Sequence, residues 1–333
     1  MASSEKKPLV SFLGPIASYS HQAVRQVFPE SKWELRPAST IDDVFDQVQD
    51  GEVTAGVVPF ENSTNGSVVF TLDNLADRNG RYKDITVDGE IFVDVHHCLV
   101  GHKSPSPLPE DLGEGSGTCT PTATDPSPTK PKSKPLTNLN HITRLYSHPQ
   151  AFGQCNAFIS TYLKNVEIFD VSSTSRAAEI VSQDTTGTWA AISSELAAHI
   201  IDGLDMLARN IEDRDDNTTR FLIIGKNTEV PKDWGLVKQS DEKFGGKTMI
   251  SVTVPHTSPG ALAEVLSCFK DHSLNLTSIN SRPSLLIPFQ YIFFIEFEGY
   301  KYDDPDGRVG GALDKIDRVA QSWRLLGSWE RYR

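Results

Sequence analysis

The stretch "RDDNTTRFLIIG", residues 214–225, predicts a buried strand that the chain enters through a polar loop. Charged residues open the stretch, two threonines follow, and Arg220 precedes the apolar run 221–224. A short apolar run between turn-forming residues is typical of a strand in an α/β sheet. Hydroxyl groups and an arginine at its mouth indicate either a capped loop or a site for an anion that also needs a proton.

Residues 8–101, on the N-terminal side, alternate predicted strands and helices, which indicates an α/β fold with parallel strands. Apolar residues at helical spacing predict one helix over 18–28 and another from Thr40, a good N-cap residue, to Gly51. Apolar runs predict strands at 9–14, 53–60 and 90–101.

Residues 102–140 are rich in Pro, Ser, Thr and Gly and lack apolar periodicity, so they predict a flexible insertion. The α/β pattern resumes at 141, with a helix expected from about Ser147 to 163. After a polar connector, residues 245–333 are predicted to form a separate small domain with the ferredoxin-like order βαββαβ. Pro259 is expected at the first position of its first helix.

The composition limits the classes of function. The 333 residues carry a net charge of −12, which argues against binding to nucleic acid or to an anionic membrane but allows an anionic substrate at a local basic site. The N-terminus lacks a signal-peptide pattern, and no apolar run is long enough to span a membrane. The four cysteines are scattered, so we expect free thiols and a cytoplasmic location.

Three segments rich in hydroxyl and amide groups stand where a predicted strand gives way to a loop or helix. Backbone N–H groups at helix starts bind anions, although Ser, Thr and Asn are also ordinary N-caps. Three such segments in one α/β region favour a polar ligand site. The segments are 59–68, 171–179 and 215–221.

The sequence allows two interpretations of Arg220. Its guanidinium group binds a carboxylate of a ligand, or it forms a structural ion pair with Asp215, Asp216 or Glu212. Because successive side chains of a strand point to opposite faces, Thr219 is expected to face the ligand and Arg220 to be partly structural.

No metal or organic cofactor is expected. The sequence has no HExxH and no paired Cys/His spacing. Residues 12–20, "FLGPIASYS", have one glycine where a dinucleotide-binding fingerprint needs three. His96 and His97 are adjacent in a predicted strand and point to opposite faces, so they make a poor metal pair.

Seven motifs, in the right order, make the chain resemble the prephenate dehydratase family, and the resemblance covers nearly the whole chain except 102–140. The last two motifs are similar to the phenylalanine-binding motifs of the family's ACT domain. Ala17 stands where the family usually has Gly, and Asn280 where it usually has Glu. The motifs are "FLGPIASYSHQAV", "GVVPFENSTNGSV", "YSHPQAFGQC", "SSTSRAAE", "TTRFLIIG", "PGALAEVL" and "NSRP".

The resemblance implies two subdomains of the periplasmic-binding-protein type (type 2), hinged around a cleft and followed by an ACT domain. The implied segments are 8–101 and 202–228 for the first subdomain, 141–201 for the second and 245–333 for the ACT domain. The implied enzyme is a carbon–oxygen lyase that removes water and carbon dioxide from prephenate and gives phenylpyruvate without a cofactor.

The resemblance also implies roles for individual residues. Thr219 donates a hydrogen bond to the leaving hydroxide, and Asn62 and Gln154 are the other catalytic residues. The implied substrate contacts are Ser63, Thr64, Ser147, Ser173, Thr174, Ser175, Arg220 and Phe221.

L-phenylalanine is the implied effector, bound between paired ACT domains of a homodimer or homotetramer. The implied effector contacts are Gly260, Ala261, Leu262, Asn280, Ser281, Arg282 and Pro283. Two alternatives stay open: an arogenate dehydratase, and a non-catalytic amino-acid sensor. The threonine of the Thr-Arg-Phe motif argues against the sensor, because a plain binder needs no proton donor there.

Overall fold

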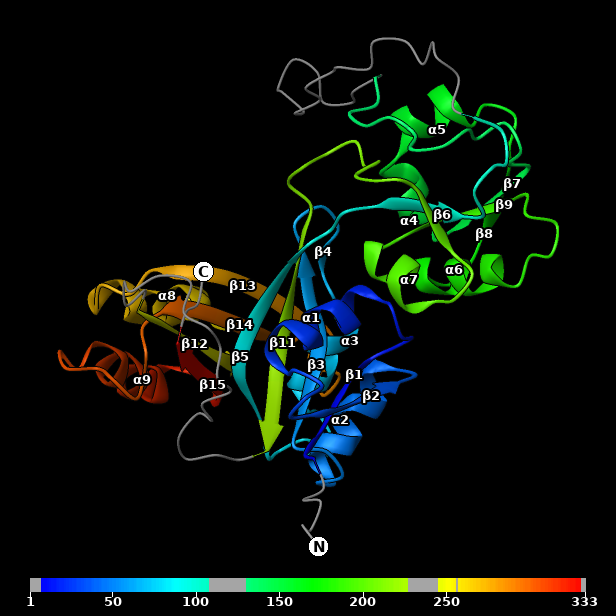
Figure 1. Ribbon diagram of the computed structural model, residues 1–333. Coiled ribbons are helices and arrows are strands. Elements are labelled where there is room, and N and C mark those ends of the chain that lie inside the picture. Colours follow the sequence, from blue (N-terminus) through cyan, green and yellow to red (C-terminus); the bar gives the residue numbers. More distant parts are fainter. Residues whose placement is uncertain (1–6, 108–129, 227–244, 256, 331–333) are drawn as a thin grey trace, which may run out of the picture. The chain divides into compact units, whose positions relative to one another are not determined.

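The computed structural model describes residues 7–107, 130–226, 245–255 and 257–330, whose strands form two sheets (Figure 1). The chain divides into two compact units. The first comprises Met1–Leu13, Ala23–Phe92 and Arg220–Arg333, and the second Gly14–Gln22 and Val93–Thr219. The predicted 108–129 part of the insertion and the connector from 227 lie outside the described residues.

The first unit is built on a ten-stranded sheet with the order β13-β14-β12-β15-β5-β11-β3-β1-β2, and β4 pairs with β3. As predicted, β1 runs parallel to β2 and to β3. The strands are β1 (Leu9–Leu13), β2 (Glu34–Ala38), β3 (Ala55–Asn62), β4 (Gly66–Ser67), β5 (Ile85–Asp94), β11 (Thr218–Lys226), β12 (Gly246–Thr253), β13 (Leu276–Pro283), β14 (Tyr291–Glu298) and β15 (Ser322–Glu330). The helices are α2 (Ile41–Gln49), α3 (Val69–Ala76), α8 (Ala261–Asp271), α9 (Arg308–Val319) and α1 (Tyr19–Val27), whose first four residues belong to the second unit.

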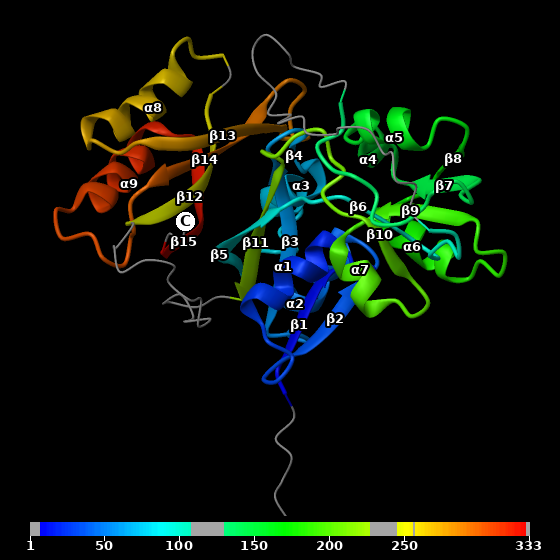
Figure 2. The same ribbon diagram turned by 45° about the horizontal axis from the view of Figure 1, so that its top comes forward.

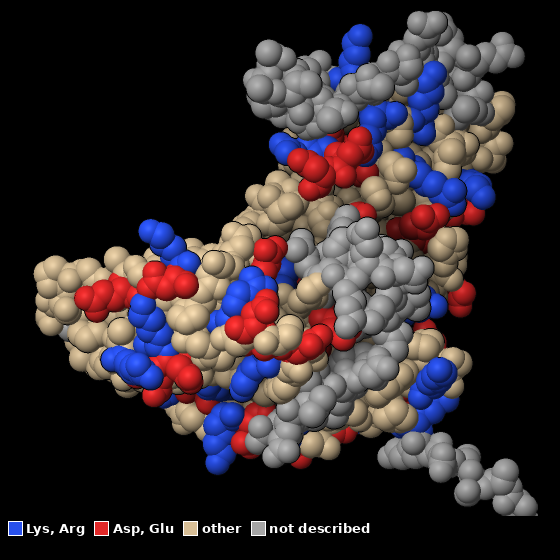
Figure 3. Space-filling view, turned by 90° about the vertical axis from the view of Figure 1, so that its left-hand side faces the viewer, with Lys and Arg blue, Asp and Glu red and all other residues tan. Residues whose placement is uncertain are grey.

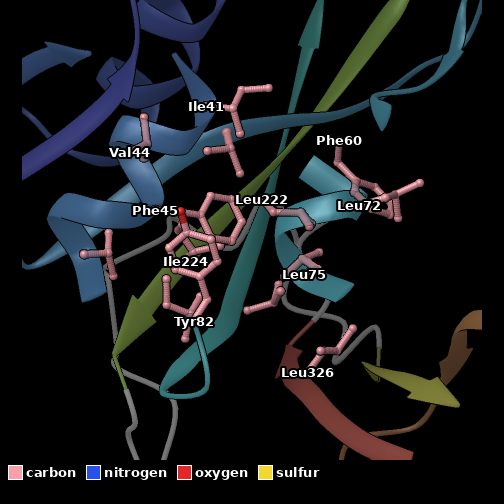
Figure 4. Packing of buried hydrophobic residues seen from close by; sticks show 14 of the residues in the cluster. Ile41, Val44, Phe45, Phe60, Leu72, Leu75, Tyr82, Leu222, Ile224 and Leu326 are labelled. Carbon is pink, nitrogen blue, oxygen red and sulfur yellow. The ribbon is translucent and has the colours of Figure 1, made fainter. Parts of the chain in front are cut away.

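Helix α2 begins and ends where its sequence predicts. The Thr40 side chain accepts a hydrogen bond from the Asp43 N–H, and the Asp43 carboxylate accepts one from the Thr40 N–H, which is a complete capping box. Gly51 follows the helix in the left-handed region, at φ 73°. The helix buries its apolar stripe, and Figure 4 shows Phe45 beside Tyr82 and Ile224 in the core of this unit.

The C-terminal segment has the predicted βαββαβ order, but it does not stand apart from the rest of the first unit. One core lies between α8, α9 and the strands β12 and β14, which Figure 2 shows side by side. Met249 of β12, Phe294 of β14 and Leu326 of β15 belong instead to the core that contains Phe45 and Leu222. Figure 4 shows Leu326 in this core. The prediction of a separate domain is therefore wrong in this respect, because the segment shares a hydrophobic core with residues that precede it.

Gly327 joins this segment to the rest of the sheet. It pairs with Val87 across the parallel contact between β15 and β5. A Cβ atom at residue 327 would lie 2.0 Å from the carbonyl oxygen of Val87, so no larger residue fits without a shift of the backbone. The predicted start of α8 is also wrong. The helix begins at Ala261, after its N-cap Gly260 at φ 84°, so Pro259 is not the first helical residue.

The second unit is built on a five-stranded sheet with the order β10-β6-β9-β7-β8. β7 is parallel to β8 and β9, whereas β6 is antiparallel to β9 and β10. The strands are β6 (Cys98–Gly101), β7 (Arg144–Ser147), β8 (Glu167–Asp170), β9 (Trp189–Ser193) and β10 (Asp205–Ala208). The helices are α4 (Pro149–Gly153), α5 (Asn156–Tyr162), α6 (Thr174–Ser182) and α7 (Glu195–Ile200).

Four predictions for this region are corrected. The single strand over 90–101 is two strands, β5 and β6, which belong to different sheets and are separated by residues 95–97. The single helix from Ser147 is two helices, because the chain turns at Gln154 and Cys155. The end of the predicted flexible insertion packs within the second unit. The Leu136 N–H donates to the Leu207 carbonyl, and Leu139 lies in the core of this unit. The chain returns to the first unit at Arg220, not near 202.

Charged side chains of both signs are interspersed with uncharged surface on the face that Figure 3 shows. Within the described ranges, no helix is long and apolar enough to cross a membrane.

Candidate functional site

Asn62 organises the turn of the first polar segment, at the end of β3. Its side-chain oxygen accepts hydrogen bonds of 3.0 Å from the N–H groups of both Thr64 and Asn65. Gly66 closes the turn at φ 80° and begins β4, which pairs with the end of β3. This arrangement fixes the Asn62 side chain and leaves Ser63 and Thr64 exposed at the tip.

The second polar segment opens α6 in the second unit. Ser173 is its N-cap and accepts a 3.0 Å hydrogen bond from the Arg176 N–H, so the N-cap interpretation holds for this residue. Thr174 is half-buried, and Ser175 is fully buried. The Ser175 hydroxyl has no hydrogen-bond partner in the described part of the chain.

Ser147 differs from its predicted setting. It is the last residue of β7 instead of the first of a helix, it is fully buried, and its hydroxyl donates a 2.8 Å hydrogen bond to the Ile192 carbonyl. His148 is the N-cap of α4 and accepts from the Gln150 N–H, in agreement with a capping role. Because the Ser147 hydroxyl donates its proton to the Ile192 carbonyl of β9, it fixes the end of β7 relative to β9.

Gln154 ends α4 and takes part in a buried polar chain that the sequence did not predict. Its side-chain oxygen lies 2.7 Å from Nε2 of His97, and the Tyr19 hydroxyl lies 2.9 Å from Nδ1 of the same ring. The His97 side chain is 2% exposed. Burial lowers the pKa of His97, so the ring is neutral at pH 7. Burial also raises the pKa of Tyr19 well above its ordinary value, so its hydroxyl keeps its proton.

Glu212 binds the backbone of His97, the central residue of this hydrogen-bonded chain. Its carboxylate accepts from the His97 N–H at 2.8 Å and lies 3.1 Å from Nδ1 of His96. Lys132, from the ordered end of the insertion, donates a 2.6 Å hydrogen bond to the same carboxylate. The carboxylate is buried, and the charged and polar donors around it compensate for the loss of solvation.

Arg220 forms structural ion pairs, but not with the three acidic residues named as alternatives. Its guanidinium group binds Glu61 at 2.9 Å and Glu90 at 2.6 Å, and it also donates to Glu296. The side chain is 4% exposed. Burial alone would lower its pKa, but the attraction of Glu90 and Glu296 outweighs burial and raises the pKa. Lys247 completes the cluster, 3.0 Å from Glu90 and 3.3 Å from Glu296.

The members of the third polar segment differ in burial along β11. Thr219 is half-buried, whereas Arg220 and Phe221 are buried. Thr218 donates a 2.7 Å hydrogen bond to Asp94. The structure does not support Arg220 and Phe221 as substrate contacts. The Arg220 guanidinium is surrounded by carboxylates of the protein, and the Phe221 side chain is buried in the core, where it is 1% exposed.

A cavity of about 300 Å³ lies at the start of α8 in the first unit. It includes three of the predicted effector contacts, Gly260, Ala261 and Leu262. The other walls are apolar or small, and they include Val254, Ser258, Phe289, Tyr291 and Phe293. The cavity is large enough for a small ligand with an apolar body.

The other predicted effector contacts do not line this cavity, because they lie on β13. Along this strand Asn280 and Arg282 are half-buried, whereas Ser281 and Pro283 are exposed. Asn280 accepts a 2.6 Å hydrogen bond from the Ser67 hydroxyl of β4, and Arg282 forms a bidentate pair with Asp73 of α3. The strand thus presents two of the four residues to the β3–β4 hairpin and α3, and two to the outside.

Ala17 adopts the conformation that the family's usual glycine takes freely. Its φ is 66°, its side chain is fully buried, and its carbonyl accepts a 2.9 Å hydrogen bond from the Ser194 hydroxyl. The turn therefore forms in this chain despite the methyl group. Within the described residues, no group of three or more His, Cys, Asp or Glu side chains is placed to hold a metal ion.

Comparison with known proteins decides the family. The family model described as "Prephenate dehydratase" matches residues 10–229. The chain belongs to the prephenate dehydratase family. A bifunctional chorismate mutase/prephenate dehydratase of Aquifex aeolicus is 34% identical over 99% of this chain and 75% of that protein. The prephenate dehydratase of Methanocaldococcus jannaschii is 32% identical over 95% of both chains.

A solved prephenate dehydratase is also similar in structure. The crystal structure of the Arthrobacter aurescens protein in complex with L-Phe superposes with a TM-score of 0.76 at 28% identity. It covers 97% of this chain and 90% of that chain. The mixed α/β fold with two sheets is therefore that of prephenate dehydratases.

In this prephenate dehydratase family member, the sequence did not predict the hydrogen bonds that join His97 to Tyr19, Glu212 and Gln154. The hydrogen bond between His97 and Gln154 depends on the break between β5 and β6, in a segment predicted to be one continuous strand. The sequence has a histidine pair at 96–97 and an acidic pair at 212–213, but nothing in their spacing predicts a contact across 115 residues.

Proposed function

We propose that the protein is a prephenate dehydratase that converts prephenate to phenylpyruvate, water and carbon dioxide in L-phenylalanine biosynthesis. The observation that carries the proposal is the family match over 10–229, which contains Asn62, Gln154 and Thr219. Aromatisation of the ring drives the elimination. The enzyme must bind a dianion and assist the departure of hydroxide, which needs a proton donor.

Thr219 is the proposed donor. A threonine hydroxyl is a weak acid, so it acts by a placed hydrogen bond that strengthens as charge develops on the leaving oxygen. Asn62 and Gln154 supply amide donors, and the arrangement of each favours this role: Asn62 is fixed by its own turn, and Gln154 is held by His97. Each such donor contributes roughly 10²–10³ in rate, by analogy with oxyanion donors.

Ser173, Thr174 and Ser175, with the N–H groups that open α6, are the proposed carboxylate contacts. The buried Ser175 hydroxyl supports this assignment, because it has no partner among the described residues. Ser63 and Thr64 are exposed at the tip of their turn, where they are accessible to the substrate. We do not assign Ser147 or Arg220 to substrate contacts, since their polar groups are hydrogen-bonded within the protein, nor Phe221, whose apolar side chain lies in the interior.

Residues 245–333 are proposed to be an ACT domain that binds L-phenylalanine and inhibits the enzyme, and the dehydratase part is proposed to be of the periplasmic-binding-protein type. The cavity beside Gly260, Ala261 and Leu262 supports the effector assignment, because apolar walls suit an aromatic side chain. Ser281 and Pro283 face outward on β13, where a second copy can supply or complete the site. Pairing of two ACT domains requires at least a homodimer.

Turnover of prephenate with and without L-phenylalanine tests both proposals. The purified protein is expected to form phenylpyruvate, followed by its ultraviolet absorbance, and to slow when L-phenylalanine is added. Arogenate is assayed in parallel, and a higher kcat/KM for arogenate would overturn the substrate assignment. Binding of an aromatic amino acid without turnover of either compound would support a sensor instead.

A further inference from the structure

Three side chains from separate parts of the second unit form a continuous hydrogen-bonded chain. Tyr19 lies in α1, His97 in the segment between β5 and β6, and Gln154 at the end of α4. The Tyr19 hydroxyl is 2.9 Å from Nδ1 of His97, and Nε2 of His97 is 2.7 Å from the side-chain oxygen of Gln154. The rings of Tyr19 and His97 also meet edge to face, with centroids 6.0 Å apart. The chain is therefore packed as well as hydrogen-bonded.

The hydrogen-bond chemistry of this chain fixes the proton on the ring. A carboxamide oxygen only accepts, so the short contact with Gln154 requires a proton on Nε2 of His97. Nδ1 of the neutral ring is then an acceptor, and the Tyr19 hydroxyl, which lies 2.9 Å from Nδ1 and 3.1 Å from the His96 carbonyl oxygen, donates its one proton to the nearer Nδ1. The His97 N–H is held separately by Glu212, which fixes the backbone that carries the ring.

The consequence falls on the amide of Gln154. A carboxamide presents either an oxygen or an NH₂ group, and the two orientations differ little in shape. With its oxygen bound to His97, Gln154 must present its NH₂ group, which has no hydrogen-bond partner among the residues that the structure describes. The backbone carbonyl of Gln154 is used as well, by the Asp213 N–H at 2.7 Å.

We propose that His97 is a positioning residue for the dehydratase reaction, which acts by turning the side-chain amide of Gln154 so that its NH₂ group donates to an oxygen of the substrate. Tyr19 selects the ring tautomer, and Glu212 holds the ring in place. This inference rests on the proposed function, because it requires that Gln154 acts on prephenate. It goes beyond that function by assigning a role to residues that do not contact the substrate.

Burial of the ring supports the same assignment. His97 is 2% exposed, and burial keeps its pKa low, so the ring has the one donor and one acceptor that the chain requires. The charged or titratable groups that face it are Glu212, His96, Lys132 and Tyr19. Glu212 favours a positive ring, whereas burial, His96 and Lys132 oppose it.

The experiment compares three substitutions of His97 in two backgrounds. His97→Gln retains an N–H near the position of Nε2, His97→Asn retains a polar group only near Nδ1, and His97→Leu retains neither. Each is made in the wild-type chain and in Gln154→Ala, and kcat and KM for prephenate are measured with the melting temperature. We expect His97→Asn and His97→Leu to lose about 10-fold to 10²-fold in kcat with little change in KM, and His97→Gln to retain most of the rate.

The Gln154→Ala background separates positioning from general disturbance. If His97 acts through Gln154, its substitution has no further effect on kcat once Gln154 is gone. Equal losses in both backgrounds, or a wild-type rate in His97→Asn, would overturn the inference while leaving the proposed function intact. A wild-type rate in Gln154→Ala would also overturn it. Absence of prephenate turnover in the wild-type chain would instead reject the proposed function, and the inference with it.

The tautomer gives a readout that does not depend on activity. In protein labelled with ¹⁵N-histidine, the His97 ring, assigned by its loss in His97→Gln, is expected to carry its proton on Nε2. Tyr19→Phe is expected to weaken this preference, because it removes the donor to Nδ1. An Nε2 that carries no proton in the wild-type chain would contradict the inference.

Discussion

The guanidinium group of Arg220 in β11 donates to the carboxylate of Glu296 in β14, although 76 residues separate them in the chain. Arg220 directly follows Thr219, and Glu296 belongs to the proposed ACT domain. The strand that carries the proposed proton donor is thus tied, one residue further on, to the proposed regulatory segment. Glu61 and Glu90 share the same guanidinium, so the tie is part of a buried charge cluster.

Arg220→Met is expected to lower the free energy of unfolding by about 3–5 kcal/mol, because it leaves three carboxylates around a site where Lys247 alone is positive. Urea unfolding measures the change. Arg214→Met is the matched control, since Arg214 forms an exposed ion pair with Asp216, and its loss is expected to cost less than about 1 kcal/mol. Equal effects of the two substitutions would mean that the buried cluster does not stabilise the fold.

The same cluster predicts how stability depends on pH. Burial alone would raise the pKa of Glu296, but Arg220 and Lys247 outweigh burial and lower it. A carboxylate whose pKa is lower in the folded chain stabilises the fold above its unfolded pKa, about 4.5, and this contribution is lost as the pH falls through the folded pKa. The stability difference between wild type and Glu296→Gln is therefore expected to be largest near pH 7 and to shrink below about pH 4.5.

Melting temperatures of the two proteins between pH 7 and pH 3 test this. A difference that stays constant, or grows, as the pH falls would show that Glu296 is not held ionised by the two cations.

Thr219→Ala is expected to lower kcat for prephenate by at least about 10², with little change in the melting temperature, because it removes the hydroxyl that assists the leaving group. Thr219→Ser keeps a hydroxyl and is expected to retain much of the rate. Thr218→Ala is the neighbouring control, since the Thr218 hydroxyl is bonded to Asp94. If Thr218→Ala is as slow as Thr219→Ala, the loss comes from the local backbone and not from the donor.

Gly260→Ala is expected to raise the concentration of L-phenylalanine needed for half-inhibition by about tenfold or more, while basal kcat is unchanged. Gly260 lines the cavity at the start of α8, an added methyl group there meets no atom of the protein within 4 Å, and φ 84° makes any side chain at this position cost about 1–2 kcal/mol. Gly307→Ala is a matched control, because Gly307 is the N-cap of α9 at φ 65° and is not among the residues that line this cavity. Loss of inhibition in both variants would assign the effect to helix strain.

Local signals predicted the elements well, because each depends on a few adjacent residues. The helix that begins at Thr40 is fixed by side chains three or four positions apart, and the structure has it at its predicted bounds. The order βαββαβ of residues 245–333 was predicted as well. The strand that opens at Thr218 was recognised for the same reason.

Contacts between distant residues were not predictable from the chain. The partners of Arg220 lie 76 to 159 residues away, whereas sequence proximity had offered Glu212, Asp215 and Asp216. The break at 95–97, which separates two strands and buries His97, follows from the way two sheets are connected and not from a local turn signal. The motif resemblance therefore pointed to Gln154, but the sequence did not predict the groups that contact its side chain.

The alternation along β13 has a practical consequence for any selection of feedback-resistant variants. Under the proposed effector assignment, substitutions of the outward Ser281 and Pro283, or of the cavity residues beside Gly260, would weaken inhibition by L-phenylalanine and leave the contacts of Asn280 and Arg282 in place. Substitutions of Asn280 and Arg282 also cut links to Ser67 and Asp73, so such strains would carry a less stable enzyme as the cost of deregulation.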